Sequence, residues 1–157
     1  QPLLDDHDAF REKLQELEAV LDEMMRLRAA DEGHRDRLDE SIRFFEEDLL
    51  PHFRLEEAAV LPPLEERIGL YGSLVNVIAY EHAEVRREID KLKEARADLT
   101  RDPHSWSAIQ ELNRHGIFTI QFLWDHFRKE RFSLFVKARE TLRPNELAAI
   151  RTRLAQR

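Results

Sequence analysis

Apolar residues recur at intervals of three and four along most of the chain, which is the spacing that places them on one face of an α-helix. Four long stretches follow this spacing, about residues 3–30, 35–60, 73–99 and 103–142, and a shorter stretch covers about 145–155. The strict alternation that is typical of β-strands is almost absent. The pattern therefore predicts an all-α protein.

The segments between these stretches are short and contain residues that begin or end helices. These signals are Gly33, Pro62, Pro63, Ser73, the pair Asp102 and Pro103, and Pro144. Pro51 lies inside the second stretch, where we expect it to kink the helix. Four long amphipathic helices with short connections predict an up-down-up-down four-helix bundle. We assign residues 1–142 to this bundle and residues 143–157 to a short C-terminal helical tail.

Composition narrows the class of protein. The chain has 157 residues, a net charge of −7, 36% charged residues and no cysteine. The acidic balance argues against a nucleic-acid partner, and the absence of cysteine excludes disulfides, thiolate ligands and iron–sulfur clusters. No apolar run is long enough to cross a membrane, and no signal-peptide pattern opens the chain. We expect a cytoplasmic protein with no membrane partner.

The candidate chemistry lies on the apolar faces of the predicted helices. Each of the four long helices carries one histidine on this face, and two of these histidines are followed four residues later by a glutamate, so that both side chains share a face. In a bundle, all four histidines fall in the same half. Two buried carboxylates without partners would cost several kcal/mol each, and a pair of metal ions removes this cost. The predicted metal ligands are His7, His52, Glu56, His82, His126 and Glu130. Iron is the metal that we expect, with zinc as the alternative.

The spacing also separates this chain from ferritin-like bundles, which place a glutamate three residues before a histidine. Here the order is reversed and the gap is four. The segments LPHFRLEE (50–57) and DHFRKE (125–130), together with LLDDHD (3–8) and EHAEVR (81–86), closely resemble hemerythrin-like, or HHE cation-binding, domains. The resemblance covers all four long helices.

The resemblance implies a non-haem di-iron centre in which Glu56 and Glu130 bridge the metals and the four histidines are terminal ligands. The oxygen carrier of this family has a fifth histidine, but Arg86 stands four residues after His82 and Ile78 four residues before it. The carrier also ends with an aspartate five residues after its histidine, where this chain has a glutamate after four. These differences argue against oxygen carriage.

Other residues near the motifs are weighed as additions to the site. Tyr71, Tyr80, Glu57 and Glu81 are the candidates for a further ligand, although packing or solvation is the simpler explanation for each of them. Asp6, Glu81 and Asp125 precede ligand histidines and are candidates to accept a hydrogen bond from a histidine on a neighbouring helix. Arg86 is placed to pair with a carboxylate of the site. His34 and His104 are expected at the surface, and His115 lies too far along its helix to be a ligand.

The function that follows from the sequence is binding or reduction of a small oxidant, with O2, peroxide and NO as candidate ligands. With two histidines, two bridging carboxylates and one bridging oxygen, each metal has about five ligands and one open position. We find no separate general acid or base, so an enzymatic role, as a peroxide- or NO-reactive oxidoreductase, is left open. The alternative is a sensor or interaction module that signals through the same centre. An arginine-rich face (Arg151, Arg153, Arg157) leaves a protein partner or a homo-oligomer open.

Overall fold

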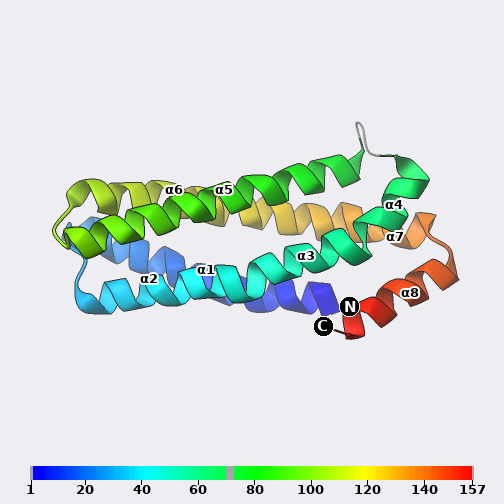
Figure 1. Ribbon diagram of the computed structural model, residues 1–157, viewed down its shortest axis with the longest axis horizontal. Helices are drawn as coiled ribbons and strands as arrows, with labels where there is room; N and C mark the ends of the chain where they lie inside the picture. Colours follow the sequence, from blue (N-terminus) through cyan, green and yellow to red (C-terminus); the bar gives the residue numbers. More distant parts are fainter. Residues whose placement is uncertain (1, 70–72, 157) are drawn as a thin grey trace.

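The computed structural model describes residues 2–69 and 73–156, and within this part the chain forms helices and no strands (Figure 1). The all-α prediction is therefore confirmed. The elements are α1 (Pro2–Leu27), α2 (Glu32–Phe44), the π-helix η1 (Phe45–Leu49), α3 (Leu50–Ala59), α4 (Leu61–Ile68), α5 (Leu74–Arg101), α6 (Trp106–Lys129), the π-helix η2 (Glu130–Leu134), α7 (Phe135–Thr141) and α8 (Pro144–Ala155).

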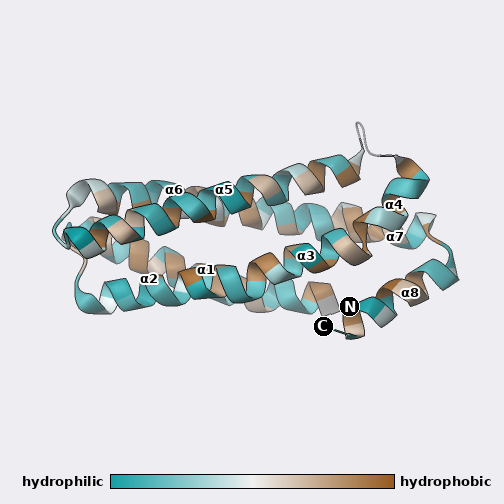
Figure 2. Ribbon diagram, viewed as in Figure 1, coloured by the Kyte–Doolittle hydropathy of each residue, from teal (hydrophilic) through white to brown (hydrophobic). Residues whose placement is uncertain are grey.

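Four long rods make the bundle: α1, then α2 with η1 and α3, then α5, then α6 with η2 and α7. Successive rods run in opposite directions, and α5 packs along α6 while α1 packs along both α6 and α2. Hydrophilic and hydrophobic positions alternate around each helix, as expected when one face is buried (Figure 2). No helix in the described part of the chain is both long and apolar enough to cross a membrane.

The buried apolar residues form two clusters. The larger one fills most of the bundle and includes Leu14, Leu21 and Leu92. The smaller one closes the end of the bundle near α8, whose Ile150 and Leu154 pack with Leu3, Val60 and Phe135. In addition, Arg153 donates a hydrogen bond to the backbone of α3 at Ala58 (2.7 Å). The division into a bundle and a tail stays a prediction, although α8 contributes apolar side chains to this second cluster.

Two π-helical turns interrupt the second and fourth rods, and one of them corrects the sequence analysis. The regular helical spacing assumed for the fourth rod would bury Ser133, three residues after Glu130, but Ser133 is exposed and Leu134 is buried. A π-turn holds more residues than an α-turn, so the inward-facing position moves one residue along the chain. On the second rod, η1 precedes Pro51, where a kink was expected. Leu50 donates its N–H to the carbonyl of Phe45, five residues back.

Several helix ends differ from the predicted ones. Gly33 was expected to end the first helix, but α1 ends near Arg28, which has a φ of 53°, and Asp31 caps the start of α2. Asp102 was expected to cap the fourth helix, but it ends α5, and Ser105 accepts the capping hydrogen bond of α6. Both Asp31 and Ser105 are good N-cap residues that lie nearer to the helices they start.

Candidate metal centre

The structure brings the six predicted ligands together inside the end of the bundle near α8. One comes from α1, two from α3, one from α5, one from α6 and one from the first position of η2. Their exposed fractions are at most 4%: His7 4%, His52 2%, Glu56 0%, His82 0%, His126 0% and Glu130 0%. Six polar side chains from five elements therefore share one dry site.

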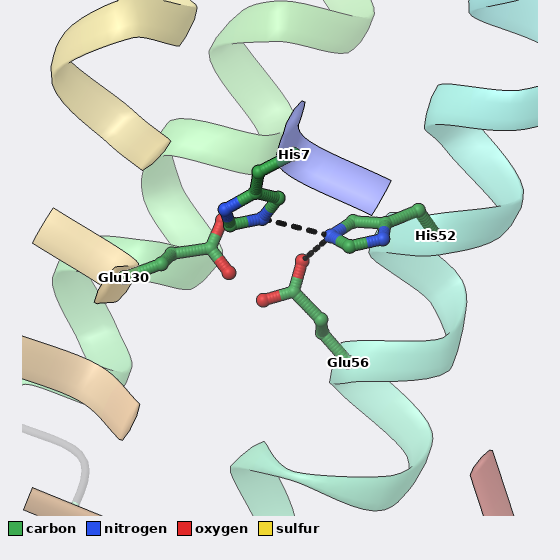
Figure 3. A group of neighbouring side chains, drawn as sticks. All are labelled: His7, His52, Glu56 and Glu130. Carbon is green, nitrogen blue, oxygen red and sulfur yellow. Dashed lines mark hydrogen bonds and ion pairs between the residues drawn. The ribbon is translucent and has the colours of Figure 1, made fainter. Parts of the chain in front are cut away.

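Four of these side chains converge at one side of the site (Figure 3). The Nε2 atoms of His7 and His52 are 3.2 Å apart, and His52 Nε2 lies 2.8 Å from Glu56 Oε1. Glu130 Oε1 approaches His7 Nε2 to 3.9 Å. Each residue in this group offers a ligand atom within 4.8 Å of the others, which is compact enough to hold one cation.

The other side of the site is formed by His82, His126 and Glu130, which make a second group that could hold a cation. Glu130 contacts His126 Nε2 directly. Glu56 Oε1 lies 3.9 Å from His82 Nε2. The histidines thus form two pairs, His7 with His52 and His82 with His126. Glu56 lies between His52 and His82, and Glu130 lies between His7 and His126, so each carboxylate reaches one histidine of each pair.

The donor set fits metal cations. Both carboxylate oxygens of Glu56 and of Glu130, and the Nε2 atoms of His82 and His126, are buried and have no hydrogen-bond partner among the described residues. Buried polar atoms are normally paired, and an unpaired buried carboxylate is costly. Imidazole nitrogen and carboxylate oxygen are ligands for iron and zinc. The arrangement is therefore explained by cations that the six side chains would bind together.

Three more carboxylates orient the histidines from outside. In each case the acid lies on a neighbouring helix, next in sequence to a residue of the site, and contacts the outer ring nitrogen. The pairs are Asp6 with His52 Nδ1 (2.9 Å), Glu57 with His82 Nδ1 (3.0 Å) and Glu81 with His126 Nδ1 (3.0 Å). Such contacts set the ring tautomer and leave Nε2 free to bind a metal.

The sequence analysis identified two of these three acids in this role. Asp6 and Glu81 are acceptors, as anticipated. Asp125 is not, because it is exposed and pairs with Lys129 (3.4 Å). Glu57 was considered only as a further ligand, and its position beside Glu56 was the available signal for the supporting role.

Two of the supporting carboxylates also contact cations. Glu57 accepts a hydrogen bond from Arg86 (2.6 Å), and Glu81 accepts one from Lys129 (2.5 Å). Burial alone would raise the pKa of both carboxyls, but the bonds to the histidines and to these cations outweigh it and lower the pKa of each. Both supporting groups are therefore held as carboxylates at neutral pH.

The ligand histidines differ in their proton affinity. Burial, followed by the nearby His52, lowers the pKa of His7 to about 3. Burial also opposes the protonation of His52, but the nearby carboxylates of Asp6 and Glu56 outweigh it and raise its pKa to about 9. His7 is thus neutral and ready to bind a cation at neutral pH. At His52 a cation must displace a proton, so binding there releases one.

Phenylalanine rings separate the site from water. Phe53 stacks on His82 at 3.9 Å between ring centroids, Phe127 stacks on His7 at 4.3 Å, and Phe10 meets His52 edge-on at 5.1 Å. Phe53, Phe127 and Phe10 thus form an apolar wall around the histidines. Phe122 instead stacks on the exposed Phe118.

The remaining histidines and Tyr80, where the structure describes them, do not join the site. Tyr80 is 61% exposed on α5. Tyr71 and Arg157 lie outside the described residues. His104 is exposed, as expected, whereas His34 was expected at the surface and is buried. His34 is drawn inward because its ring and backbone complete the cap with Asp31 at the start of α2, and its Nε2 reaches Glu23 (3.2 Å).

His115 is held by Glu88 (2.6 Å) and Glu111 (3.1 Å), apart from the site, in agreement with its exclusion as a ligand.

Comparison with known proteins identifies the family. Residues 1–138 match the family model described as the hemerythrin HHE cation binding domain. Neither the curated proteins nor the solved structures gave a match. The matched segment contains all six clustered residues and most of the chain, so this protein belongs to the hemerythrin HHE cation-binding family.

Proposed function

We propose that this chain holds two iron ions and binds or reduces a small oxidant, with O2, peroxide and NO as candidates. The ligands would be His7 and His52 at one iron and His82 and His126 at the other, with Glu56 and Glu130 shared between them. The observation that carries the proposal is the placement of each buried carboxylate against one histidine of each pair.

Iron would supply the redox chemistry, and the protein supplies ligands, orientation and a dry environment. The supporting acids Asp6, Glu57 and Glu81 hold three imidazoles with Nε2 toward the site. The phenylalanine rings around the histidines limit access by water. No further acid or base is needed for binding a ligand, so we assign no separate catalytic residue.

A groove lined by residues of α1, η1 and α3 reaches the outer side of the site. Its volume is about 740 Å³, and both His52 and Asp6 line it. Phe10 and Phe44 contribute apolar surface beside them. Lys13, Glu47 and Asp48 also line the groove, so its surface is mixed.

Metal analysis and spectroscopy of the natively purified protein test the proposal. We expect two irons per chain and, in the oxidised protein, visible absorption from oxo-to-ferric charge transfer. His82→Ala should lose bound iron, whereas His104→Ala, which alters an exposed histidine, should keep it. Close to zero bound iron in the unaltered protein would overturn the proposal, and two zinc ions in its place would overturn the redox function.

Reaction with oxidants then separates an enzyme from a sensor. Release of O2 from peroxide, or sustained consumption of NO, supports turnover at the site. Formation of a stable ferrous nitrosyl without turnover supports a sensor, in which the centre would signal through its occupancy.

A further inference from the structure

One ligand histidine lacks the outer partner that the other three have. Asp6, Glu57 and Glu81 contact the Nδ1 atoms of His52, His82 and His126. His7 Nδ1 is buried and has no hydrogen-bond partner among the described residues. Its ring stacks on Phe127, which offers an apolar face and no acceptor for an N–H group.

This difference has a chemical consequence once a metal is bound. His7 Nε2 faces the site, because it lies 3.2 Å from His52 Nε2 and 3.9 Å from Glu130. An imidazole that binds a metal through Nε2 carries its proton on Nδ1, and that N–H needs an acceptor. The described residues provide a carboxylate for each of the other three rings and none for His7, which leaves a place for an acceptor from solution.

A small cavity at His7 has the electrostatic character to bind a hydrogen-bond acceptor from solution. Its volume is about 160 Å³, roughly that of five waters in the liquid. Three arginines line it, Arg11, Arg128 and Arg131, together with aromatic side chains that include Trp124 and Phe132. No acidic side chain is among the described lining residues.

The arginines are only partly neutralised by their neighbours. Arg131 lies 3.2 Å from Asp8, and Arg128 lies 3.7 Å from Asp125. The two aspartates are exposed and do not line the cavity. The Arg11 guanidinium lies over the Trp124 ring, 5.2 Å from its centroid. The cavity is therefore positively charged, and an anion inside it would be attracted by guanidinium groups that bind carboxylates well.

We propose that this cavity binds a small monovalent anion of the carboxylate type, such as formate or acetate. The anion accepts the Nδ1–H of His7 and pairs with Arg131, and so takes the place that a glutamate or aspartate occupies at the other three histidines. The inference rests on the proposed metal centre, because the metal at Nε2 is what fixes the proton on Nδ1.

The test uses the full chain loaded with zinc, which is diamagnetic, and labelled with ¹⁵N-histidine. Formate is titrated against chloride at constant ionic strength while the ring N–H signals are followed by NMR. We expect a saturable shift of the His7 Nδ1–H signal, with little change at His52, His82 and His126. Arg131→Gln should weaken formate binding at least tenfold, whereas Arg114→Gln, an exposed arginine on α6 outside the cavity, should leave it unchanged.

Zinc content is measured in the same samples, so that the two proposals fail separately. Two zinc ions per chain with no saturable shift at His7 would overturn the anion site alone. Equal shifts of all four histidine signals, unchanged in Arg131→Gln, would show that formate binds the metal and would also overturn the anion site. Fewer than two zinc ions in the unaltered chain would overturn the metal centre and the anion site together.

Discussion

The two ends of the bundle are built on opposite principles. At the end of the α1–α2 and α5–α6 connections, the core is apolar and closely packed, with Leu14, Leu21 and Met24 fully buried. At the other end, the same four rods bury histidines and carboxylates, and the polar atoms of Glu56 and Glu130 have no hydrogen-bond partner. The first end is stabilised by apolar packing alone, whereas the second combines an apolar cluster with buried polar groups that bound cations would stabilise. The fold can carry the second because the first secures the rods.

Removing the metal should separate the two ends most clearly. Tight binding to the folded state alone adds about 4 kcal/mol of stability when the metal is at roughly 1,000 times its dissociation constant. Chelation should therefore remove about this much stability and leave the carboxyl groups of Glu56 and Glu130 buried without a ligand. Hydrogen exchange measured by mass spectrometry should show α3 and η2 losing protection, while the α1 segment around Leu21 keeps it.

Equal loss of protection along all four rods would contradict the proposed difference between the two ends of the bundle, because the apolar end would then depend on the metal as well. A useful control is re-addition of zinc, which should restore protection at α3 and η2 if the ligands are intact.

A cavity in the apolar end should have the converse effect. Leu92 is 2% exposed and lies ten residues beyond His82 on α5, about 15 Å along the helix. Leu92→Ala should lower the free energy of unfolding by about 2–5 kcal/mol, from lost burial and an unfilled cavity, with no change in metal content. Denaturant unfolding of the metal-free and metal-loaded forms measures this.

Leu27→Ala is the matched control, since Leu27 is 60% exposed and its truncation should change stability little. Loss of bound metal in Leu92→Ala, under conditions where the protein is folded, would show that the apolar end shapes the site.

A smaller effect should come from the carboxylates that support the histidines. Glu81→Gln keeps the shape of the side chain but removes the charge shared by His126 and Lys129. Metal affinity should fall by about 10–100-fold, as is usual when an outer partner of a ligand histidine is altered. Competition with a chelator of known affinity measures the change. Glu84→Gln on the same helix, which pairs with Arg87 outside the site, should leave metal affinity unchanged.

An unchanged affinity in Glu81→Gln would mean that packing alone orients His126. The stacked ring of Phe53, which contacts His82 and meets His126 edge-on, would then be the stronger influence on both rings.

The sequence predicts the clustering of the six side chains because its signals are local. Helical spacing places His52 with Glu56, and His126 with Glu130, on shared inward faces, and the antiparallel rods bring these faces to one level. The supporting contacts depend on how neighbouring helices are rotated, which no local pattern specifies. The role of Glu57 was missed for this reason. The π-turn at Glu130, which buries Leu134 in place of Ser133, is likewise a departure from regular helical spacing.

The smallest expected effect concerns a helix cap at the apolar end and tests whether the two ends are independent. Asp31 Oδ1 accepts the His34 N–H at 2.8 Å, and the Asp31 N–H contacts His34 Nδ1 at 3.2 Å. Asp31→Ala should lower the free energy of unfolding by about 1 kcal/mol, which is typical for the loss of an N-cap. Metal affinity should not change, because α2 begins about five helical turns before His52. Denaturant unfolding and chelator competition on the same samples measure both quantities, with the exposed Asp36→Ala as control. A loss of affinity in Asp31→Ala alone would show that the start of α2 sets the position of α3, and the two ends would have to be treated as one cooperative unit.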